Sequence, residues 1–258
     1  MRPDELFDLS AKVAIVTGGA GDIGRVYARA LCEVGANVVL ADVKAGAVND
    51  AAAALRASGF SATSVTVDVT DAESTKVMAA AAIEAFGGID ILINNAAIMV
   101  DLPPFRLSNM PPEEWDRVMG VNVKGPLLCT QAVVPSMTER GGGRIINGLS
   151  AGAFMKMGGI YGVSKLALHA LTASLASELG PLGINVNAIA PGLIESESGY
   201  ASLPKDSPVR AELEMSIPGQ KSGPPEDLVG TLLLLCSNAG SWINGQSISV
   251  DGGWIMRL

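Results

Sequence analysis

The sequence has few cysteine, histidine and aromatic residues. Its three cysteines, Cys32, Cys129 and Cys236, are odd in number and far apart, which fits neither a disulfide framework nor a paired metal motif. The single histidine, His169, cannot make a metal site alone. We therefore expect the cysteines to be buried as small apolar residues, His169 to serve in packing, and no metal to be bound.

Basic clusters and long apolar runs are also missing. The net charge is −8, from 18 basic and 26 acidic residues, and no cluster of lysine or arginine could follow a phosphate backbone. Hydrophobic residues make up 48% of the chain and the mean hydropathy is +0.36, yet no stretch reaches the roughly 18 apolar residues of a membrane span. The first nine residues include acidic side chains where a signal peptide has an apolar core. We expect a cytoplasmic protein with no nucleic-acid or membrane partner.

Predicted strands and helices alternate along the whole chain. This alternation predicts one α/β domain over residues 1–258, with a parallel sheet covered by helices on both faces. A capping box at Thr70-Asp-Ala-Glu73 predicts that a helix begins there, with Thr70 as the cap. The seven predicted strands are Val13–Val16, Val38–Ala41, Ser64–Val67, Ile89–Ile93, Arg144–Ile146, Asn185–Ala190 and Gln246–Val250.

A glycine-rich turn follows the first strand. It reads Thr17-Gly-Gly-Ala-Gly-Asp-Ile-Gly24 and leads into a predicted helix at 25–33. The second strand ends in Asp42, which lies 18 residues after Gly24, where a carboxylate can accept a ribose 2′-hydroxyl. Strand, turn, helix and acidic residue together predict a dinucleotide site.

A tyrosine and a lysine lie four residues apart in Tyr161-Gly-Val-Ser-Lys165. In a helix this spacing is one turn, roughly 6 Å, so the phenol and the ammonium share one face. A nearby cation favours the ionised phenol, so we expect Lys165 to lower the pKa of Tyr161. The pair predicts a proton-transfer site.

Taken in order, these motifs resemble those of the short-chain dehydrogenases/reductases. The resemblance covers the whole chain, and so many motifs in one order are highly specific. It implies a single-domain Rossmann fold, doubly wound, a nicotinamide cofactor, and a tyrosine that acts on a hydroxyl or carbonyl group. The matching residues are Thr17-Gly18, Gly24, Asp68-Val69, Asn94-Asn-Ala-Ala97, Asn122, Ser150, Tyr161, Lys165 and Pro191-Gly192.

The resemblance also implies roles for single residues. Ser150 would hold the substrate oxygen, Tyr161 would transfer its proton, and Lys165 would hold the nicotinamide ribose. Asn122 would bend its helix and hold a water that leads to the lysine, and no metal is required. The cofactor-binding residues would be Gly18, Asp22, Ile23, Gly24, Asp42, Asp68, Val69, Asn95, Ala96, Tyr161, Lys165, Pro191, Gly192, Ile194 and Ser196.

Three positions depart from the family pattern. Asp22 replaces the middle glycine of the turn, where it could cap the following helix but also brings negative charge toward the pyrophosphate. Ala97 replaces a glycine, which requires a backbone without positive φ. Ser150 precedes Tyr161 by 11 residues, fewer than the family pattern has, so the loop at 151–159 must be tight.

Apolar side chains near these motifs suggest an apolar or cyclic substrate. The alternative is that they pack the subunit or its neighbours. Residues 195–223 are predicted to form a lid over the site, and Lys156 is expected to be solvated. The candidate wall residues are Ile98, Met99, Phe154, Met155, Met157, Tyr200 and Met215.

The sequence thus predicts an enzyme that transfers a hydride between NAD and a secondary alcohol or ketone. Asp42, followed by Val43 rather than arginine, favours NAD, although Lys44 could partly compensate. Two alternatives stay open: an NADP-linked 3-oxoacyl reductase and a non-catalytic NAD-sensing regulator. Apolar helices around Asn122 and Tyr161 predict a homo-oligomer, by resemblance a tetramer, with residues 245–258 at an interface.

Overall fold

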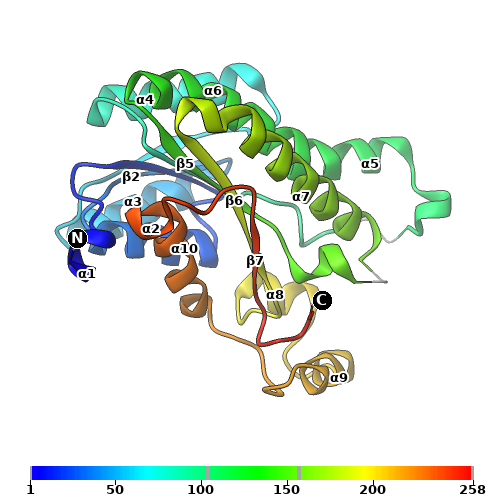
Figure 1. Ribbon diagram of the computed structural model, residues 1–258. Helices are drawn as coiled ribbons and strands as arrows, with labels where there is room; N and C mark the ends of the chain where they lie inside the picture. The colour runs from blue at the N-terminus through cyan, green and yellow to red at the C-terminus, as the bar shows by residue number, and fades with distance from the viewer. Residues whose placement is uncertain (1, 103–104, 156–157, 257–258) are drawn as a thin grey trace.

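A central parallel sheet organises the chain in the computed structural model, which describes residues 2–102, 105–155 and 158–256 (Figure 1). Its strands are β1 (Val13–Thr17), β2 (Asn37–Asp42), β3 (Ala62–Thr66), β4 (Ile91–Asn94), β5 (Gly143–Gly148), β6 (Ile184–Pro191) and β7 (Ser247–Val250). They pair in the order β3-β2-β1-β4-β5-β6-β7, and every pair is parallel. The strand order reverses between β1 and β4, so a crevice opens there at the carboxyl ends of the strands.

The predicted fold class is confirmed. All seven predicted strands are present, with ends that differ by one or two residues; the third, for example, spans Ala62–Thr66 rather than 64–67. β1 and β4 are buried along their whole length. Helices cover both faces of the sheet, which explains why these strands are continuous apolar runs rather than alternating ones.

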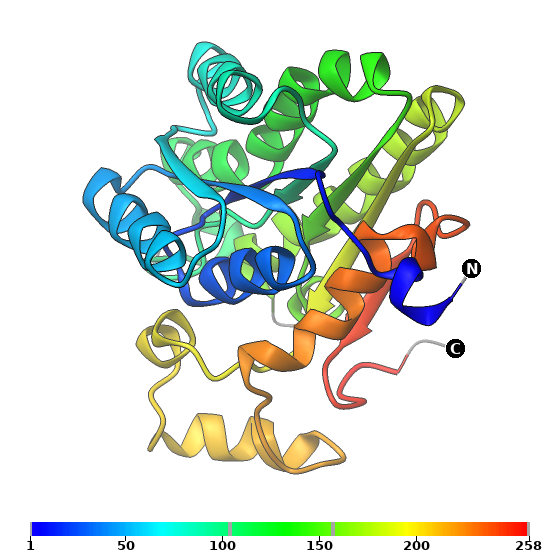
Figure 2. The same cartoon turned by 90° about the vertical axis from the view of Figure 1, so that its left-hand side faces the viewer.

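Except for two that lie beyond the end of β6, the helices cover both faces of the sheet. They are α1 (Pro3–Leu6), α2 (Asp22–Glu33), α3 (Ala45–Ala57), α4 (Ala72–Phe86), α5 (Pro112–Met119), α6 (Gly125–Glu139), α7 (Gly159–Leu179), α8 (Glu197–Ser202), α9 (Pro208–Ser216) and α10 (Val229–Cys236). Apolar side chains of α2, α3 and α10 pack on one face, and those of α4, α6 and α7 pack on the other. Figure 2 shows α8 and α9 below these layers, past the end of β6.

One predicted helix cap is wrong. Asp71, not Thr70, caps α4 by accepting the backbone N–H of Glu73 at 3.1 Å. Thr70 instead donates its hydroxyl and its backbone N–H to Oδ1 of Asp68, at 2.7 and 2.9 Å. A carboxylate two residues upstream offers Thr70 a closer partner than the helix does.

The cysteines and the histidine lie in packed surroundings, as predicted. Cys32, Cys129 and Cys236 are buried, and burial raises the pKa of Cys129 to about 12. The ring of His169 meets that of Phe154 edge-on at 5.5 Å, and its Nδ1 lies 2.8 Å from Oγ of Ser247. Within the described ranges, no helix is long and apolar enough to cross a membrane.

Candidate functional site

A cleft of about 1840 Å³ runs along the carboxyl ends of the strands. Ligand pockets for one small molecule are typically about 300–1,000 Å³, so this volume suits a dinucleotide together with a substrate. Every predicted site residue except Asn122 lines it. They are Gly18, Asp22, Ile23, Gly24, Asp42, Asp68, Val69, Asn95, Ala96, Ser150, Tyr161, Lys165, Pro191, Gly192, Ile194 and Ser196.

The glycine turn between β1 and α2 is too tightly packed for side chains at several positions, among them Gly18 and Gly24. Gly18 has a φ of +64°, and a Cβ there would lie 2.9 Å from Cα of Ala96. A Cβ on Gly24 would overlap the carbonyl oxygen of Gly18. Glycine at both positions therefore lets the turn close tightly and brings the N-terminus of α2 to the cleft, where a helix N-terminus favours an anion.

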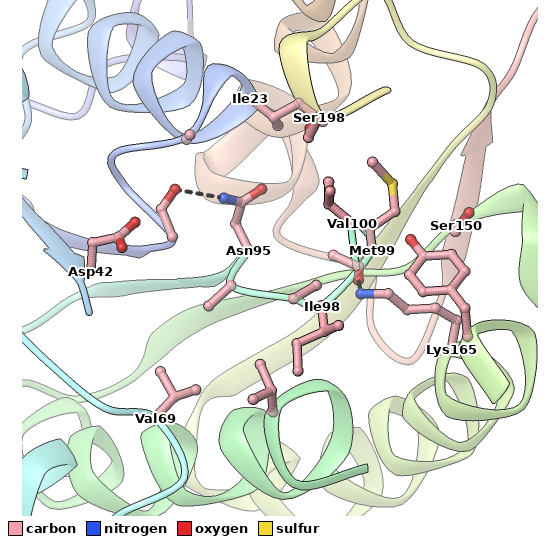
Figure 3. Close-up of a pocket in the computed structure, with 18 of the residues that line it drawn as sticks. Ile23, Asp42, Val69, Asn95, Ile98, Met99, Val100, Ser150, Lys165 and Ser198 are labelled. Atoms are coloured by element: carbon pink, nitrogen blue, oxygen red, sulfur yellow. Dashed lines mark hydrogen bonds between the residues drawn. The ribbon is translucent and has the colours of Figure 1, made fainter. Parts of the chain in front are cut away.

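Hydrogen bonds fasten this turn to the chain that follows β4. Oγ1 of Thr17 accepts the backbone N–H groups of Asn95 and Ala96, each at 3.1 Å. In return, Nδ2 of Asn95 donates to the carbonyl oxygens of Thr17 and Gly18, each at 3.1 Å. Figure 3 shows the Asn95 side chain between the turn and the cleft. The floor of the cleft is thus held together across the point where the strand order reverses.

Asp42 is the last residue of β2, and two backbone donors orient its carboxylate. Oδ2 accepts the N–H of Ala20 at 3.1 Å, and Oδ1 accepts the N–H of Lys44 at 3.0 Å. Each oxygen has further lone pairs for a ligand hydroxyl. The carboxylate is therefore fixed at the rim of the cleft in a position that can receive a ribose.

Tyr161 and Lys165 lie one turn apart on α7, as predicted. Nζ of Lys165 is 5.6 Å from the centre of the Tyr161 ring. Ser150 follows β5, and its side chain lies near enough to Tyr161 to act on the pKa of the phenol, while both residues line the cleft. Oγ of Ser150 also accepts the N–H of Gly152 at 3.1 Å, which starts a short 3₁₀ turn at Ala151–Phe154. This tight turn brings the serine beside the tyrosine in spite of the short spacing between them.

The ionisation of Tyr161 differs from the sequence-based expectation. Burial raises the pKa of the phenol, and the nearby Ser150 hydroxyl opposes this only in part. Burial also lowers the pKa of Lys165 to about 8, and its ammonium donates to the carbonyl oxygen of Gly148 at 2.6 Å. The expected lowering of the Tyr161 pKa by Lys165 is therefore wrong for this structure, because desolvation is the larger effect on both groups.

Asn122 lies behind the cleft rather than in its wall. It is fully buried in a π-helical turn, Gly120–Lys124, which joins α5 to α6, so the predicted distortion of the helix is present. Its Oδ1 accepts the N–H of Ile98 at 2.7 Å, and its Nδ2 donates to the carbonyl oxygen of Ile98 at 3.1 Å and to Oγ of Ser164 at 3.0 Å. Asn122 thus ties the segment after β4 to α7, which carries Tyr161.

The predicted apolar wall is correct only in part. Ile98 and Met99 line the cleft, and Ala97 has no positive φ. Phe154 and Met155 do not line it, and Phe154 packs on His169 instead. Tyr200 and Met215 do not line it either, whereas Lys156 and Met157 lie outside the described residues. The structure adds Val100, Leu193, Ala201 and Leu203 to the wall.

Two hydrogen-bond partners of the predicted catalytic residues were not predicted from the sequence. Ser164 holds Asn122, and it lies inside the Tyr161–Lys165 segment where its position could have drawn notice. Gly148 holds Lys165 through its carbonyl oxygen. Every residue carries such a carbonyl, so no side-chain pattern could have singled it out.

Comparisons with known proteins agree on one family. A family model described as enoyl-(acyl carrier protein) reductase matches residues 18–255. An uncharacterized oxidoreductase of Mycobacterium tuberculosis is 44% identical over 252 residues, which are 98% of this chain and 100% of that protein. Human dehydrogenase/reductase SDR family member 4 is 40% identical over 254 residues, which are 97% of this chain and 90% of the human protein.

Solved structures share the fold. A short-chain type dehydrogenase/reductase from Mycobacterium marinum has a TM-score of 0.90 and 35% identity, with 98% of this chain and 99% of that chain covered. A gluconate 5-dehydrogenase from Burkholderia cenocepacia, in complex with NADP and tartrate, has a TM-score of 0.91 and 31% identity, with 98% of each chain covered.

The burial of Lys165 predicts a pH-dependent cost in stability. Its pKa is about 8 in the folded protein against 10.5 for a free side chain, so the unfolded chain binds the proton more tightly and the free energy of unfolding rises between those pH values. We expect Lys165→Met to be about 1–3 kcal/mol more stable than the parent at pH 7, with a difference that shrinks toward pH 10.5. Urea unfolding at several pH values measures this.

Lys76→Met is the matched control for this measurement. Lys76 lies on the surface in a salt bridge with Glu73, so its removal should leave the stability nearly unchanged at every pH. A Lys165→Met variant less stable than the parent at pH 7 would show that the hydrogen bond to Gly148 outweighs the cost of burying the charge.

Proposed function

Because the chain is an oxidoreductase of the short-chain dehydrogenase/reductase family, we propose that it transfers a hydride between NAD and a secondary alcohol or ketone. One observation carries this proposal. Ser150, Tyr161 and Lys165 meet at one part of a cleft that also contains the glycine turn and Asp42. A proton-transfer group beside a dinucleotide site in one cleft fits hydride transfer better than it fits a protein that only binds the dinucleotide.

The residues of the cleft fit NAD. The N-terminus of α2 and the tight glycine turn offer backbone donors for the pyrophosphate. Asp42 is positioned for the adenosine ribose, and Val69 gives an apolar surface for the base. Pro191, Gly192, Ile194 and Ser196 form the facing wall. When bound, NAD supplies the hydride acceptor.

The catalytic residues would act on the substrate oxygen. Ser150 and Tyr161 lie close together in the cleft, so an alcohol oxygen placed between them could bond to both hydroxyls. During oxidation Tyr161, in its ionised form, takes the hydroxyl proton as the carbon gives up its hydride, and a ketone remains. Lys165 would hold the nicotinamide ribose with its ammonium. Asn122 touches none of these atoms and acts by positioning α7 and the segment after β4.

An apolar or cyclic substrate suits the wall beside Tyr161. This wall contains Ile98, Met99, Val100, Leu193 and Leu203. Figure 3 shows Met99 and Val100 on the same side of the cleft as Ser150 and Lys165. The gluconate 5-dehydrogenase shares this fold, so the fold alone does not select the substrate class and the side chains of the wall must do so.

The NADP-linked 3-oxoacyl reductase is the second candidate. The matching family model is described as enoyl-(acyl carrier protein) reductase, which shares an acyl substrate but names a different reaction, and the Burkholderia structure contains NADP. Asp42 argues against it, because a 2′-phosphate would face the carboxylate directly. The third candidate, a cofactor-sensing regulator, would not need Ser150 and Tyr161 together in the cleft.

We also propose that the chain acts in the cytoplasm as a homo-oligomer, with a tetramer favoured. Trp242 is 98% exposed just before β7, the edge strand of the sheet, and Met256 is 75% exposed just after it. Large apolar side chains left in water at a sheet edge are typical of surfaces that a second subunit covers.

Tyr161→Phe removes the transferable proton and keeps the ring. We expect alcohol oxidation to fall by about a hundredfold or more, while NADH binds as before. A panel of cyclic, aromatic and terpenoid alcohols with NAD, followed by the absorbance of NADH, identifies a substrate for the measurement. Tyr200→Phe is the control, because Tyr200 contacts Arg210 and does not line the cleft. Near-normal turnover in Tyr161→Phe would remove this residue from the mechanism.

Asp42→Ala tests the choice of cofactor. The parent should have a higher kcat/KM with NAD than with NADP, and the variant should narrow this preference by roughly tenfold to a hundredfold, because it loses the ribose acceptor and relieves the repulsion of the phosphate. Asp42→Asn, which keeps the shape without the charge, separates the two effects. A parent enzyme that prefers NADP would instead favour the acyl reductase.

Sedimentation velocity at micromolar concentration tests the assembly. We expect a species larger than the monomer, and Trp242→Ser should shift it toward smaller forms by removing apolar area from the interface. Val77→Ser, a change of an exposed apolar residue on α4, should leave the assembly unchanged. A parent protein that sediments as a monomer would contradict the proposal.

A further inference from the structure

Asp22 joins the glycine turn to the segment 195–223. It is the first residue of α2, and its Oδ2 accepts the backbone N–H of Glu197 at 2.6 Å, across 175 residues of sequence. Glu197 is the first residue of α8. We propose that Asp22 is a clasp that holds α8 across the cofactor cleft and so slows the release of the dinucleotide. This inference rests on the proposed function for the identity of that ligand.

The partner of Asp22 is a donor that α8 cannot satisfy itself. The first N–H groups of any helix lack a carbonyl partner within the helix. Ser196 caps one of them by accepting the N–H of Gly199 at 3.0 Å. Asp22 supplies an acceptor for another from outside the helix, and a charged acceptor makes such a bond stronger than a neutral one does. Glycine at this position could not make the contact.

The bond from Asp22 closes a bridge over the cleft. At the other end of α8, Oγ of Ser202 donates to the carbonyl oxygen of Met99 at 3.2 Å. Ser198 and Ala201, between these two attachments, line the cleft. Figure 3 shows Ser198 beside Ile23, the residues next to the bonded pair. One end of α8 is therefore held on the cofactor side and the other on the side of the apolar wall.

Contacts within residues 195–223 connect α8 to the rest of this segment. At its base, the N–H of Glu195 donates to the carbonyl oxygen of Gly223 at 2.9 Å. Inside it, Arg210 is 1% exposed, donates to Glu214 at 3.0 Å and to Ser222 at 2.5 Å, and faces the Tyr200 ring at 4.6 Å. These contacts make α8 and α9 one unit with its own buried centre. Releasing α8 from the glycine turn would therefore loosen the segment as a whole, with the bond from Ser202 to Met99 left in place.

A second role for Asp22 predicts the opposite result. The carboxylate lies at the N-terminus of α2, where the pyrophosphate is expected, so it could act simply by repelling the cofactor. Removing the charge would then make NADH bind more tightly and leave more slowly. A clasp depends on the hydrogen-bond acceptor, whereas repulsion depends on the charge, and Asn keeps the first without the second.

Four variants separate these roles. Asp22→Ala removes the acceptor, and Asp22→Asn keeps one. Glu197→Pro removes the donor from the other side; proline is well tolerated at the first position of a helix, and Ser196 before it is already extended, with φ −143° and ψ 157°. Glu197→Ala keeps the donor and controls for the loss of the side chain.

The first measurement is NADH dissociation, followed by stopped-flow fluorescence. Losing a hydrogen bond to a charged group corresponds to roughly tenfold, so we expect Asp22→Ala and Glu197→Pro to release NADH about tenfold faster. Asp22→Asn and Glu197→Ala should stay within about threefold of the parent. The double variant Asp22→Ala/Glu197→Pro should be no faster than either single variant, because both break the same bond.

The second measurement is trypsin cleavage after Lys205, an exposed residue between α8 and α9. It should accelerate in Asp22→Ala and Glu197→Pro with or without NADH, and thermal unfolding checks that each variant is folded. Unchanged NADH release and cleavage in both variants would overturn the clasp, as would slower release in both Asp22→Ala and Asp22→Asn. If NADH binds to no variant and not to the parent, the proposed function fails, while cleavage still decides the clasp.

Discussion

The hydrogen bonds between Thr17 and the chain after β4 are the constraint on which the site depends. They join the glycine turn to Asn95 and Ala96 at the point where the strand order of the sheet reverses. Thr17 is almost fully buried, so these bonds form away from water, and an unpaired partner there would be costly. With the turn fixed, the N-terminus of α2 and the carboxylate of Asp42 lie along one side of the cleft, and the strand ends that carry Ser150 and Pro191 lie along the other.

Burial of Tyr161 and Lys165 at the other end of the cleft prepares them for proton transfer but lowers the stability of the fold. Tyr161 and Lys165 both shift toward their neutral forms, because each loses water when α7 packs against the sheet. A phenol that holds its proton more tightly is suited to donating it to a ketone oxygen in the reductive direction. The same burial places the ammonium of Lys165 inside the protein, where it donates to the carbonyl oxygen of Gly148. A functional group kept in an unfavourable setting is typical of active sites.

The parts of the cleft differ in how specific they are to this chain. The glycine turn apart from Asp22, the carboxylate of Asp42 and the serine–tyrosine–lysine set follow the family pattern, and a gluconate 5-dehydrogenase shares the fold. The apolar wall and the attachment of α8 depend on residues outside that pattern. Asp22 shows the difference most clearly, because a departure that adds charge to the pyrophosphate site also gives α8 an external cap.

The sequence by itself determined the strands, the glycine turn, the acidic end of β2 and the Tyr161–Lys165 pair. Each of these follows from short-range rules: apolar runs for buried parallel strands, glycine where the backbone needs positive φ or close approach, and four residues for one helical turn. The order of the motifs then assigned them to one crevice. Strand ends moved by a residue or two, because the ladder ends where pairing ends rather than where apolarity does.

Only the tertiary structure decided which effect controls the pKa of Tyr161, where the Phe154 side chain packs and what Asp22 contacts. The pKa of Tyr161 depends on how much water the whole fold removes from it, and no local spacing encodes that quantity. Phe154 is close to Ser150 in sequence but packs on His169 and on a buried apolar cluster that includes Leu168 of α7. Asp22 meets Glu197 across 175 residues through a backbone N–H, which every residue except proline carries and which therefore leaves no mark in the sequence.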